Sequence, residues 1–472
     1  MKRVLLFLTR NPLSLLGTAL TTASAVLILS LLLVELLGGF EGSPYLGIIV
    51  FLILPGLFVA GLLLIPLGHW RQRRRELAGK STKDALPVLN LNEDNTRRGA
   101  LLFLVATIVN VVILGTATFK GIEVSESANF CGETCHKVME PEFTVWQRSP
   151  HSRVQCVSCH IGPGASWFVK SKLSGSWQVV SVLFNLYPRP IPSPVHNLRP
   201  ARETCEQCHW PTKFVGDRLK QITHYESDEV NGPRTTVLLV RVGGKAGSSS
   251  KGIHWHVDPG VTIRYRSDEK RERIDEIELT RADGTKTVYK GPAAPAENGK
   301  PAPAATVWRS MDCVDCHNRP THIYRNPEGA VDGVILDGRV DRSLPFVRRE
   351  ALRLVQEKYA SHDDGRAKIL AGLKEFYAKN YADLATSKAA AIDAAGKAVG
   401  EAWAVNVFPG MNVQWGTYPN HIGHQGSPGC FRCHDDEHKS ADGRQISQDC
   451  NLCHALLAQD EEHPEILKQL NP

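Results

Sequence analysis

The hydrophobic pattern separates an apolar stretch of about 120 residues from a more polar remainder. Residues 13–37, 45–67 and 100–119 form three nearly uninterrupted apolar runs, the second broken only by Pro55 and Pro66. Each run is long enough to cross the hydrocarbon layer of a membrane, which takes about 20 helical residues. A cleaved signal peptide is the alternative for the first run, because a basic start and an Ala-Ser-Ala sequence are present. The apolar run continues well past that sequence, so we predict three retained transmembrane helices.

The loops between these runs predict how the helices are oriented. The loop after the second run is rich in Arg and Lys, whereas residues 38–44 contain neither. Because positively charged loops stay in the cytoplasm, the N-terminus is expected inside a bacterial inner membrane, and the chain after the third run in the periplasm. Residues 1–120 hold 12 Lys+Arg and 6 Asp+Glu, which accounts for the whole formal charge of +6. That charge therefore reflects topology and does not indicate nucleic-acid binding.

Strand-like alternation is confined to one part of the outer region. Residues 235–242 and 261–265 are expected as strands, and residues 274–280 and 286–289 flank an Ala-Asp-Gly turn typical of a hairpin. Gly/Ser-rich and Pro/Ala-rich connectors border this part. Helical patterning follows further along the chain, at residues 344–359, 363–381 and 385–407.

Six cysteine pairs, each followed directly by histidine, are distributed over the outer region. Five have the form Cys-x-x-Cys-His, the first carries one extra residue, and together they use all 12 cysteines. In such a motif the thiols add to the haem vinyl groups and the histidine becomes the proximal iron ligand, so we predict six covalently bound c-type haems. The motifs are Cys131/Cys135/His136, Cys156/Cys159/His160, Cys205/Cys208/His209, Cys313/Cys316/His317, Cys430/Cys433/His434 and Cys450/Cys453/His454.

Zinc sites and disulfides explain this pattern less well. A zinc site would need a second pair of ligands at matched spacing, whereas every cysteine pair here has its own histidine. A disulfide within Cys-x-x-Cys is strained and requires no neighbouring histidine. The pattern therefore indicates an electron carrier.

The number of motifs limits the architecture of the outer region. Roughly 59 residues per haem are too few for separate domains, so the haems are expected to supply much of the core. We predict a multihaem cytochrome c, mostly α-helical and irregular, with a small β-rich insert and three N-terminal transmembrane helices. The expected divisions are a membrane anchor at 1–120, a domain with the first three motifs at 121–220, the insert and its Pro/Ala linker at 221–306, and a C-terminal haem region at 307–472 with a helical segment at 344–407.

A haem that only transfers electrons usually has a second strong axial ligand. Twelve histidines lie outside the motifs, and their positions narrow the choice. His254 and His256 are expected on one face of a strand, with His256 as the ligand. The other candidates precede a motif in a Pro- or Gly-rich segment or follow a motif histidine by four or five residues: His151, His196, His421, His424, His322 and His438.

Met139 is a different kind of candidate. It follows His136 by three residues, which places it on the same side of a short helix. Ligation by its thioether would raise the potential of the first haem. The alternative is a methionine that packs against the porphyrin.

One stretch combines several of these features. The third apolar run leads straight into Phe130-Cys131, Met139-Glu-Pro follows the first motif, Ser-Pro-His151 precedes the second, and Ile-Gly-Pro follows His160. On these features the stretch from the third run to about Lys213 resembles the NapC/NirT family of membrane-anchored multihaem quinol dehydrogenases, which includes the NrfH-type proteins. This chain has three spans where the family usually has one, an extra residue in the first motif, Met139 one position later, and two further motifs.

The resemblance implies a function and a site. In that family the haem nearest the membrane, often with a methionine ligand, accepts electrons from quinol, and the other haems pass them to a periplasmic partner. Lys170 and Lys172 fall where the family places a lysine near the quinol pocket, and Glu140 and Glu142 are candidates to accept a proton. The alternative for both lysines is pairing with lipid phosphate.

The sequence therefore predicts a membrane-anchored hexahaem cytochrome that oxidises quinol from the membrane pool and feeds a periplasmic or outer-membrane redox protein. The two additional spans are expected to support the quinol site or to bind membrane subunits. Two alternatives stay open. One is a passive electron-transfer subunit of a larger respiratory complex, and the other is a terminal reductase of a small oxyanion or metal.

Overall fold

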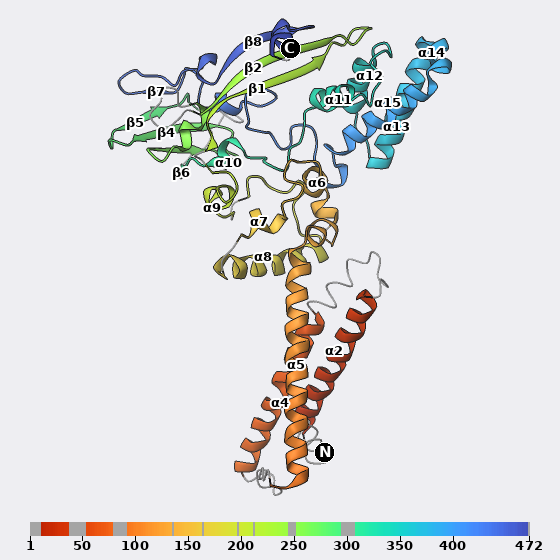
Figure 1. The fold of residues 1–472 in the computed structure, drawn as a ribbon, viewed down its shortest axis with the longest axis vertical. Coiled ribbons are helices and arrows are strands. Elements are labelled where there is room, and N and C mark those ends of the chain that lie inside the picture. Colours follow the sequence, from red (N-terminus) through yellow and green to blue (C-terminus); the bar gives the residue numbers. More distant parts are fainter. Residues whose placement is uncertain are drawn as a thin grey trace. The chain divides into compact units, whose positions relative to one another are not determined.

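A computed structural model describes residues 11–36, 53–78, 92–134, 136–162, 165–195, 198–210, 213–243, 252–293 and 307–470. The chain divides into two compact units, Met1–His136 and Lys137–Pro472, each of which is considered by itself (Figure 1). The predicted loop at 38–44 and most of the two connectors that border the β-rich insert lie outside the described residues.

Three long helices make up the described part of the first unit: α2 (Pro12–Leu36), α4 (Leu54–Leu77) and α5 (Asp94–Glu126). All three are long and apolar enough to cross a membrane, as the sequence predicts. Of the second predicted span, residues 45–52 lie outside the described part, and α4 continues beyond residue 67 into the Arg-rich segment. There Arg74 lies 4.1 Å from the ring centroid of Trp70, a pairing suited to the polar boundary of a membrane.

Small residues bring α2 and α4 together. A Cβ atom added to Gly17 would lie 2.7 Å from the carbonyl oxygen of Gly61, so only glycine permits this approach. The Ser14 hydroxyl donates to the carbonyl of Ile65 at 3.0 Å. Close backbone contact and interhelical hydrogen bonds are the usual means by which helices associate in lipid. The two helices therefore pack against each other as an antiparallel pair.

The second unit begins with short helices separated by loops. These are α6 (His136–Gln147), α7 (Cys156–His160), α8 (Ala165–Leu183) and α9 (Ala201–Cys205). α8 is the longest of them. Sparse regular structure around the motifs agrees with the predicted fold class.

Two antiparallel sheets follow. The first has the strand order β1-β2-β8 and the second the order β6-β3-β4-β5-β7. All four predicted strands are present, within β2 to β5, but β1 and β6 to β8 were not predicted. The bounds are β1 (Gly216–Tyr225), β2 (Pro233–Gly243), β3 (Val261–Ser267), β4 (Ile274–Arg281), β5 (Lys286–Lys290), β6 (Trp308–Ser310), β7 (Lys439–Ser440) and β8 (His454–Glu461).

The sheets join distant parts of the chain. β7 and β8 come from the C-terminal haem region, yet each adds to a sheet that begins in the predicted insert. The buried residues Tyr265, Ile277 and Tyr289 form part of the core of the larger sheet. The insert is therefore no separate module, because it is hydrogen-bonded to the segments that carry the last two motifs.

A group of helices with its own apolar core lies between the fourth and fifth motifs. Its centre is Trp403, which is 1% exposed, and a Cβ atom on Gly365 would lie 2.3 Å from the Trp403 ring. The predicted helix at 344–359 is shorter than expected, because Phe346 adopts a left-handed conformation (φ 57°) directly before it. The helices are α11 (Pro327–Leu336), α12 (Val347–Val355), α13 (His362–Asn380), α14 (Ala382–Ser387) and α15 (Ala389–Ala404).

Candidate haem sites

Each of the five regular motifs includes or adjoins a short helical turn. The turns are α7, α9, α10 (Cys313–Cys316), η6 (Gly429–Arg432) and η7 (Cys450–Leu452). Residues three apart on such a turn lie on the same side, so both thiols of a motif can reach one porphyrin. Among the described residues, both thiols of motifs three to six and Cys159 of motif two are free. The donor chemistry therefore suits two thioether bonds at each motif.

The two thiols of the third motif have different surroundings. α9 ends at Cys205, and Cys208 lies in the turn that follows the helix. The backbone N–H groups of Cys208 and His209 donate to the carbonyl oxygen of Cys205, at 3.1 and 2.8 Å. Cys208 is exposed, whereas Cys205 is half-buried. Attachment of a haem at Cys208 stays a prediction. The other exposed thiols of the described residues are Cys159, Cys316 and Cys450.

The histidine of each regular motif faces one histidine from outside the motifs. The ring centroids of the five pairs are 5.9 to 6.3 Å apart. The two histidines of a pair lie in separate segments of the chain. The pairs are His160 with His322, His209 with His151, His317 with His254, His434 with His256, and His454 with His424.

This spacing fits two axial ligands on a single iron. A bond between a metal and an imidazole nitrogen is about 2 Å long, so two imidazoles that share a metal place their centroids roughly 6 Å apart. Direct packing of two rings explains the uniform spacing less well, since the angle between the ring planes varies from 5° to 78°. The residues present therefore fit haem c with two histidine ligands at five sites.

Hydrogen bonds orient four of the outer imidazoles. The Nδ1 atoms of His151, His254, His256 and His322 each lie 2.7 to 3.1 Å from a backbone carbonyl oxygen. A carbonyl only accepts, so Nδ1 carries the proton and Nε2 keeps its lone pair. Metal-bound histidines usually have this arrangement, in which the second nitrogen donates to the protein.

Burial favours the neutral form of several of these imidazoles. Burial lowers the pKa of His322 to about 4. It also lowers the pKa of His160, His256 and His317 below the ordinary value. A neutral imidazole is the form that binds a metal, and burial favours this form of these rings near neutral pH.

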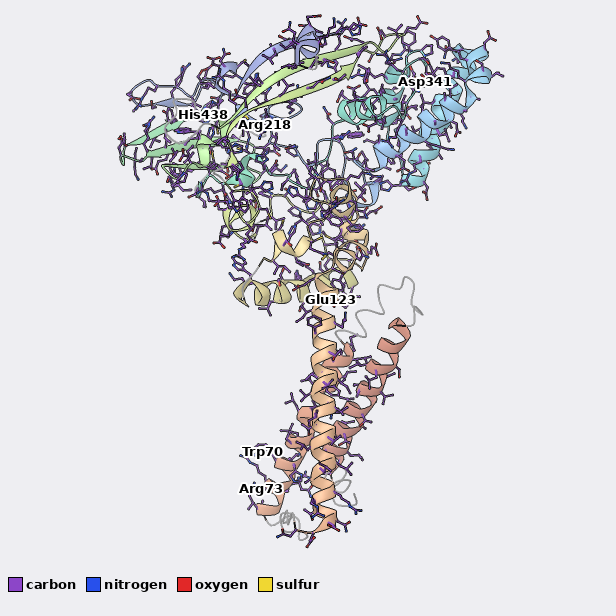
Figure 2. All side chains as sticks on the ribbon, in the orientation of Figure 1. Trp70, Arg73, Glu123, Arg218, Asp341 and His438 are labelled. Carbon is purple, nitrogen blue, oxygen red and sulfur yellow. The ribbon has the colours of Figure 1, made fainter. Side chains whose placement is uncertain are left out.

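Two histidines that the sequence predicts as iron ligands, His421 and His438, have different surroundings from these five pairs. His438 is 1% exposed, with Nδ1 2.8 Å from a carboxylate oxygen of Asp435 and Nε2 3.2 Å from the carbonyl oxygen of Ile274. Both of its nitrogens are engaged, and it lies among the strands of the larger sheet (Figure 2). His421 is buried beside Arg432, while His424 is the ring that faces His454. We do not assign His421 or His438 to a haem.

The structure corrects the prediction for the segment that contains His254 and His256. The sequence predicts a strand on which His254 and His256 point to one side, with His256 as the ligand. The structure has a single 3-10 turn, η4 (Ile253–Val257), and both histidines face a motif histidine. A 3-10 turn has three residues per turn, so residues two apart point in different directions. A His-x-His sequence next to a glycine is the signal that could have suggested this arrangement.

The first motif is described in part. Cys131 lies in the π-helical turn η2 (Phe130–Thr134). Cys135 and the side chain of His136 are outside the described residues, as are the side chains of His196 and Lys172. Met139 packs against a cluster that includes Phe408. Ligation by Met139 stays a prediction.

The two candidate proton acceptors occupy different environments. The Glu142 side chain is 15% exposed, with Oε2 3.0 Å from Nδ1 of His322 and Oε1 3.9 Å from Arg319. Burial raises the pKa of Glu142, and the positive charge of Arg319 opposes this. The Glu140 side chain is 50% exposed, and its carboxylate lies 3.4 Å from Nδ1 of His362. Glu140 is therefore the more accessible of the two carboxylates.

α8 presents an apolar stripe to its surroundings. Leu173 is 70% exposed, Trp177 63% and Val180 39%, and their spacing of four and three residues places them on one side of the helix. On the same helix the Lys170 ammonium lies 4.6 Å from the ring centroid of Trp167. Aromatic, aliphatic and lysine side chains in this combination are typical of a helix at a membrane interface.

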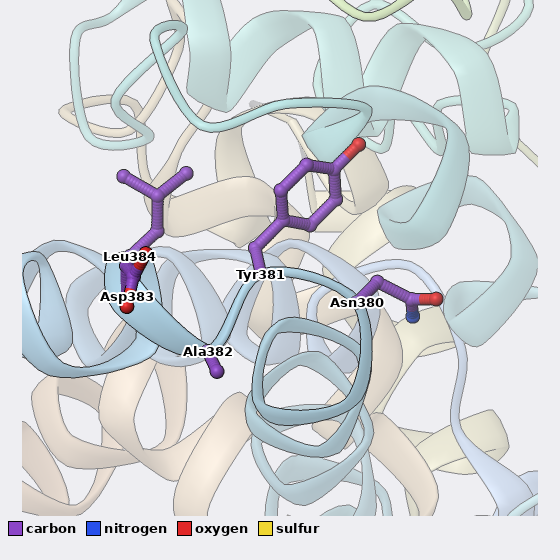
Figure 3. A pocket seen from close by; sticks show the side chains of 5 residues that line it. All are labelled: Asn380, Tyr381, Ala382, Asp383 and Leu384. Atoms are coloured by element: carbon purple, nitrogen blue, oxygen red, sulfur yellow. The ribbon is translucent and has the colours of Figure 1, made fainter.

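A shallow pocket lies at the junction of α13 and α14, away from the motifs in sequence. It is lined by Asn380, Tyr381, Ala382, Asp383 and Leu384 (Figure 3). Five consecutive residues around a helix junction form this pocket, and it contains no motif residue. We assign no function to it.

Comparison with known proteins identifies relatives of this chain. The N-terminal region of the NapC/NirT cytochrome c family matches residues 93–190. The chain is 44% identical over 457 residues to the cytochrome c-type protein ImcH of Geobacter sulfurreducens, an alignment that covers 96% of this chain and 89% of ImcH. No solved structure matches the chain significantly. The chain therefore belongs to the NapC/NirT family of membrane-anchored c-type cytochromes, which carry covalently bound haem c and transfer electrons.

Proposed function

We propose that this protein holds six haems, oxidises quinol from the membrane and delivers the electrons to a periplasmic redox protein. The observation that carries the proposal is the set of five imidazole pairs, each spaced to hold one iron. The sixth haem would be held by Cys131, Cys135 and His136 of the first motif. α5 ends at Glu126 and Cys131 follows within η2, so this motif comes directly after the third apolar helix.

One-electron carriers can accept the electrons of quinol oxidation but not its protons. Oxidation of a quinol to a quinone releases two electrons and two protons. When bound, each haem c takes up a single electron and no proton. The protein must therefore supply a base for the protons near the point where quinol is oxidised. Glu140 follows the first motif and is half-exposed, which suits it to accept a proton and pass it to water.

The ligand pairs favour the first motif as the place where quinol reacts. Each regular motif histidine already faces a second imidazole, so these five sites are suited to electron carriage and leave no open position for a substrate. This argues against a terminal reductase that binds its substrate at one of the five. The first motif differs in spacing and directly follows a membrane span, and quinol is confined to the membrane.

α8 supports contact with a lipid-soluble substrate. Its stripe of Leu173, Trp177 and Val180 is apolar and exposed, whereas Lys170 offers a cation that can hydrogen-bond to a quinol oxygen. The same stripe suits the boundary between lipid and water. We therefore place Lys170 with Glu140 in the proposed quinol site.

The proposal is tested with haem-loaded protein in lipid nanodiscs under anaerobic conditions. We expect a menaquinol analogue to reduce the haems, and we expect Lys170→Ala and Glu140→Gln to slow that reduction roughly tenfold. Lys468→Ala is the matched control, because Lys468 is exposed and pairs only locally with Glu465 at 2.7 Å. Haems that dithionite reduces but the quinol analogue does not would contradict the proposal and favour a passive electron-transfer subunit.

A further inference from the structure

We propose that the haem sites of motifs two to six are nearest neighbours in the order of the chain, and that the turn His254-Trp255-His256 joins the fourth site to the fifth. This inference rests on the ligand pairs assigned above and is independent of which donor supplies the electrons. Sequence order alone gives no reason for it, because about 100 residues separate the third motif from the fourth and again the fourth from the fifth.

Direct contacts link motifs two, three and four. The turn that carries motif two packs against α9 of motif three, and α9 in turn packs against α10 of motif four. The carboxylate of Asp312, at the start of α10, accepts a hydrogen bond from the backbone N–H of Ala201 at the start of α9, at 3.0 Å. The turns that hold these three sites are therefore in contact in chain order.

Motifs four, five and six are linked in the same way. Arg432, inside motif five, donates to the carbonyl oxygen of Asp315, inside motif four, at 2.6 Å. Nδ1 of His434 in motif five lies 2.8 Å from the carbonyl oxygen of Ser447, three residues before Cys450 of motif six. Side chains of motif five are thus hydrogen-bonded to the backbone of motif four and to the segment that leads into motif six.

The turn η4 places ligands of two sites within three residues. His254 faces His317 of motif four, and His256 faces His434 of motif five. The turn is anchored at both ends, because Nδ1 of His254 lies 3.0 Å from the carbonyl oxygen of Val242 and Arg202 of α9 donates to the carbonyl oxygen of Val257. A shared turn of this length holds the two sites next to each other with little freedom to separate.

The assignment is tested by removing ligands and haems in combination, with oxidised haem-loaded protein and electron paramagnetic resonance as the readout. His254→Ala is expected to convert one low-spin haem to high spin, and His256→Ala a different one. In a Cys313→Ala/Cys316→Ala background, His254→Ala should have no further effect while His256→Ala still does. In a Cys430→Ala/Cys433→Ala background the two results should be exchanged.

Two further variants distinguish the loss of an iron ligand from a general loss of folding. His254→Met and His256→Met keep a sixth ligand, so they should stay low-spin and show a methionine–iron absorption band. His463→Ala is the control, since the His463 side chain is 79% exposed and is assigned to no haem. An unchanged spin state in His254→Ala or His256→Ala, or the opposite dependence on the cysteine backgrounds, would overturn the assignment.

The order of the sites is tested by magnetic coupling in the same samples, with haem content measured for each variant. Removal of site six through Cys450→Ala/Cys453→Ala should change the coupling of site five and leave sites two to four unaltered. Removal of site five should change both site four and site six. Coupling of site six to site two or site three would overturn the chain order, whatever the protein does with quinol.

Discussion

The imidazole of His254 lies almost parallel to that of His317, with an angle of 5° between the ring planes and 6.3 Å between the centroids. The pair His256 and His434 shares the spacing of about 6 Å but has an angle of 78°. The two histidines of one short turn therefore face their motif histidines in different orientations, one nearly parallel and one nearly perpendicular.

This difference predicts two classes of low-spin haem. Near-perpendicular axial imidazoles give highly anisotropic ferric signals, whereas near-parallel imidazoles give ordinary rhombic ones. We expect His256→Ala to remove a highly anisotropic signal and His254→Ala to remove a rhombic one, each by about one haem per protein. A low-temperature electron paramagnetic resonance spectrum of each variant measures this. Loss of the same signal in both variants would contradict the geometry.

A second prediction concerns the connection between the larger sheet and motif four. The Tyr265 hydroxyl donates to the carboxylate of Asp315, which lies inside that motif and is 5% exposed. Burial, followed by the Asp315 charge, raises the pKa of Tyr265, so the hydroxyl stays protonated and remains a donor. Tyr265→Phe leaves a buried carboxylate short of one partner, which costs about 1–3 kcal/mol. Arg271 retains its contact with Asp315 at 3.2 Å.

Thermal unfolding of the haem-loaded protein measures this cost. Tyr265→Phe should lower the melting temperature, while Tyr289→Phe, in the same apolar cluster, keeps the contact to Asp315 intact and serves as the control. Equal melting temperatures for wild type and Tyr265→Phe would show that this hydrogen bond contributes nothing.

Local patterns in the sequence predict much of this structure, and long-range pairings set the rest. The three membrane helices, the strands β2 to β5 and helix α13 follow from apolar periodicity and turn residues, which act over a few positions. β8 begins at His454, and its register depends on pairing with β2, more than 200 residues earlier. Periodicity contains no information on such a pairing, so β8 was not predicted.

The same limit applies to the sites. The motif residues are identified by spacing alone, because attachment of the haem requires both thiols and the histidine within one turn. The second ligands are harder to predict, since His322, which faces His160, comes from another part of the chain. The flanking residues predict His151, His424 and His421 as candidates alike. Only the structure shows that His151 and His424 face a motif histidine.

A third prediction addresses the core of the helical segment. A Cβ atom on Gly365 would lie 2.3 Å from the ring of Trp403, so Gly365→Ala forces the ring to shift. Such overpacking costs about 1–3 kcal/mol, which exceeds the gain in helix propensity of about 1 kcal/mol. Gly410→Ala is the control, because a Cβ atom there meets nothing within 4 Å. Chemical denaturation followed by tryptophan fluorescence should show a lower midpoint for Gly365→Ala only, and a rise would refute the packing.

A fourth prediction concerns α8. Leu173→Glu with Trp177→Glu places two charges in the exposed apolar stripe, which opposes contact with lipid. The rate of haem reduction by the quinol analogue should fall about tenfold, and the absorption spectrum of the haems should stay the same. Gln178→Glu adds charge to the same helix outside the stripe and should change the rate by less than about twofold. An unaltered rate in the double variant would separate α8 from quinol oxidation.

A cryo-electron microscopy map of the haem-loaded protein tests the central assignment most directly, because it shows both axial ligands of every iron. The account predicts an iron between each of the five named histidine pairs, with the sites of motifs two to six adjacent in chain order. An iron at any regular motif bound by a side chain other than the one named, or left without a sixth ligand, would contradict it.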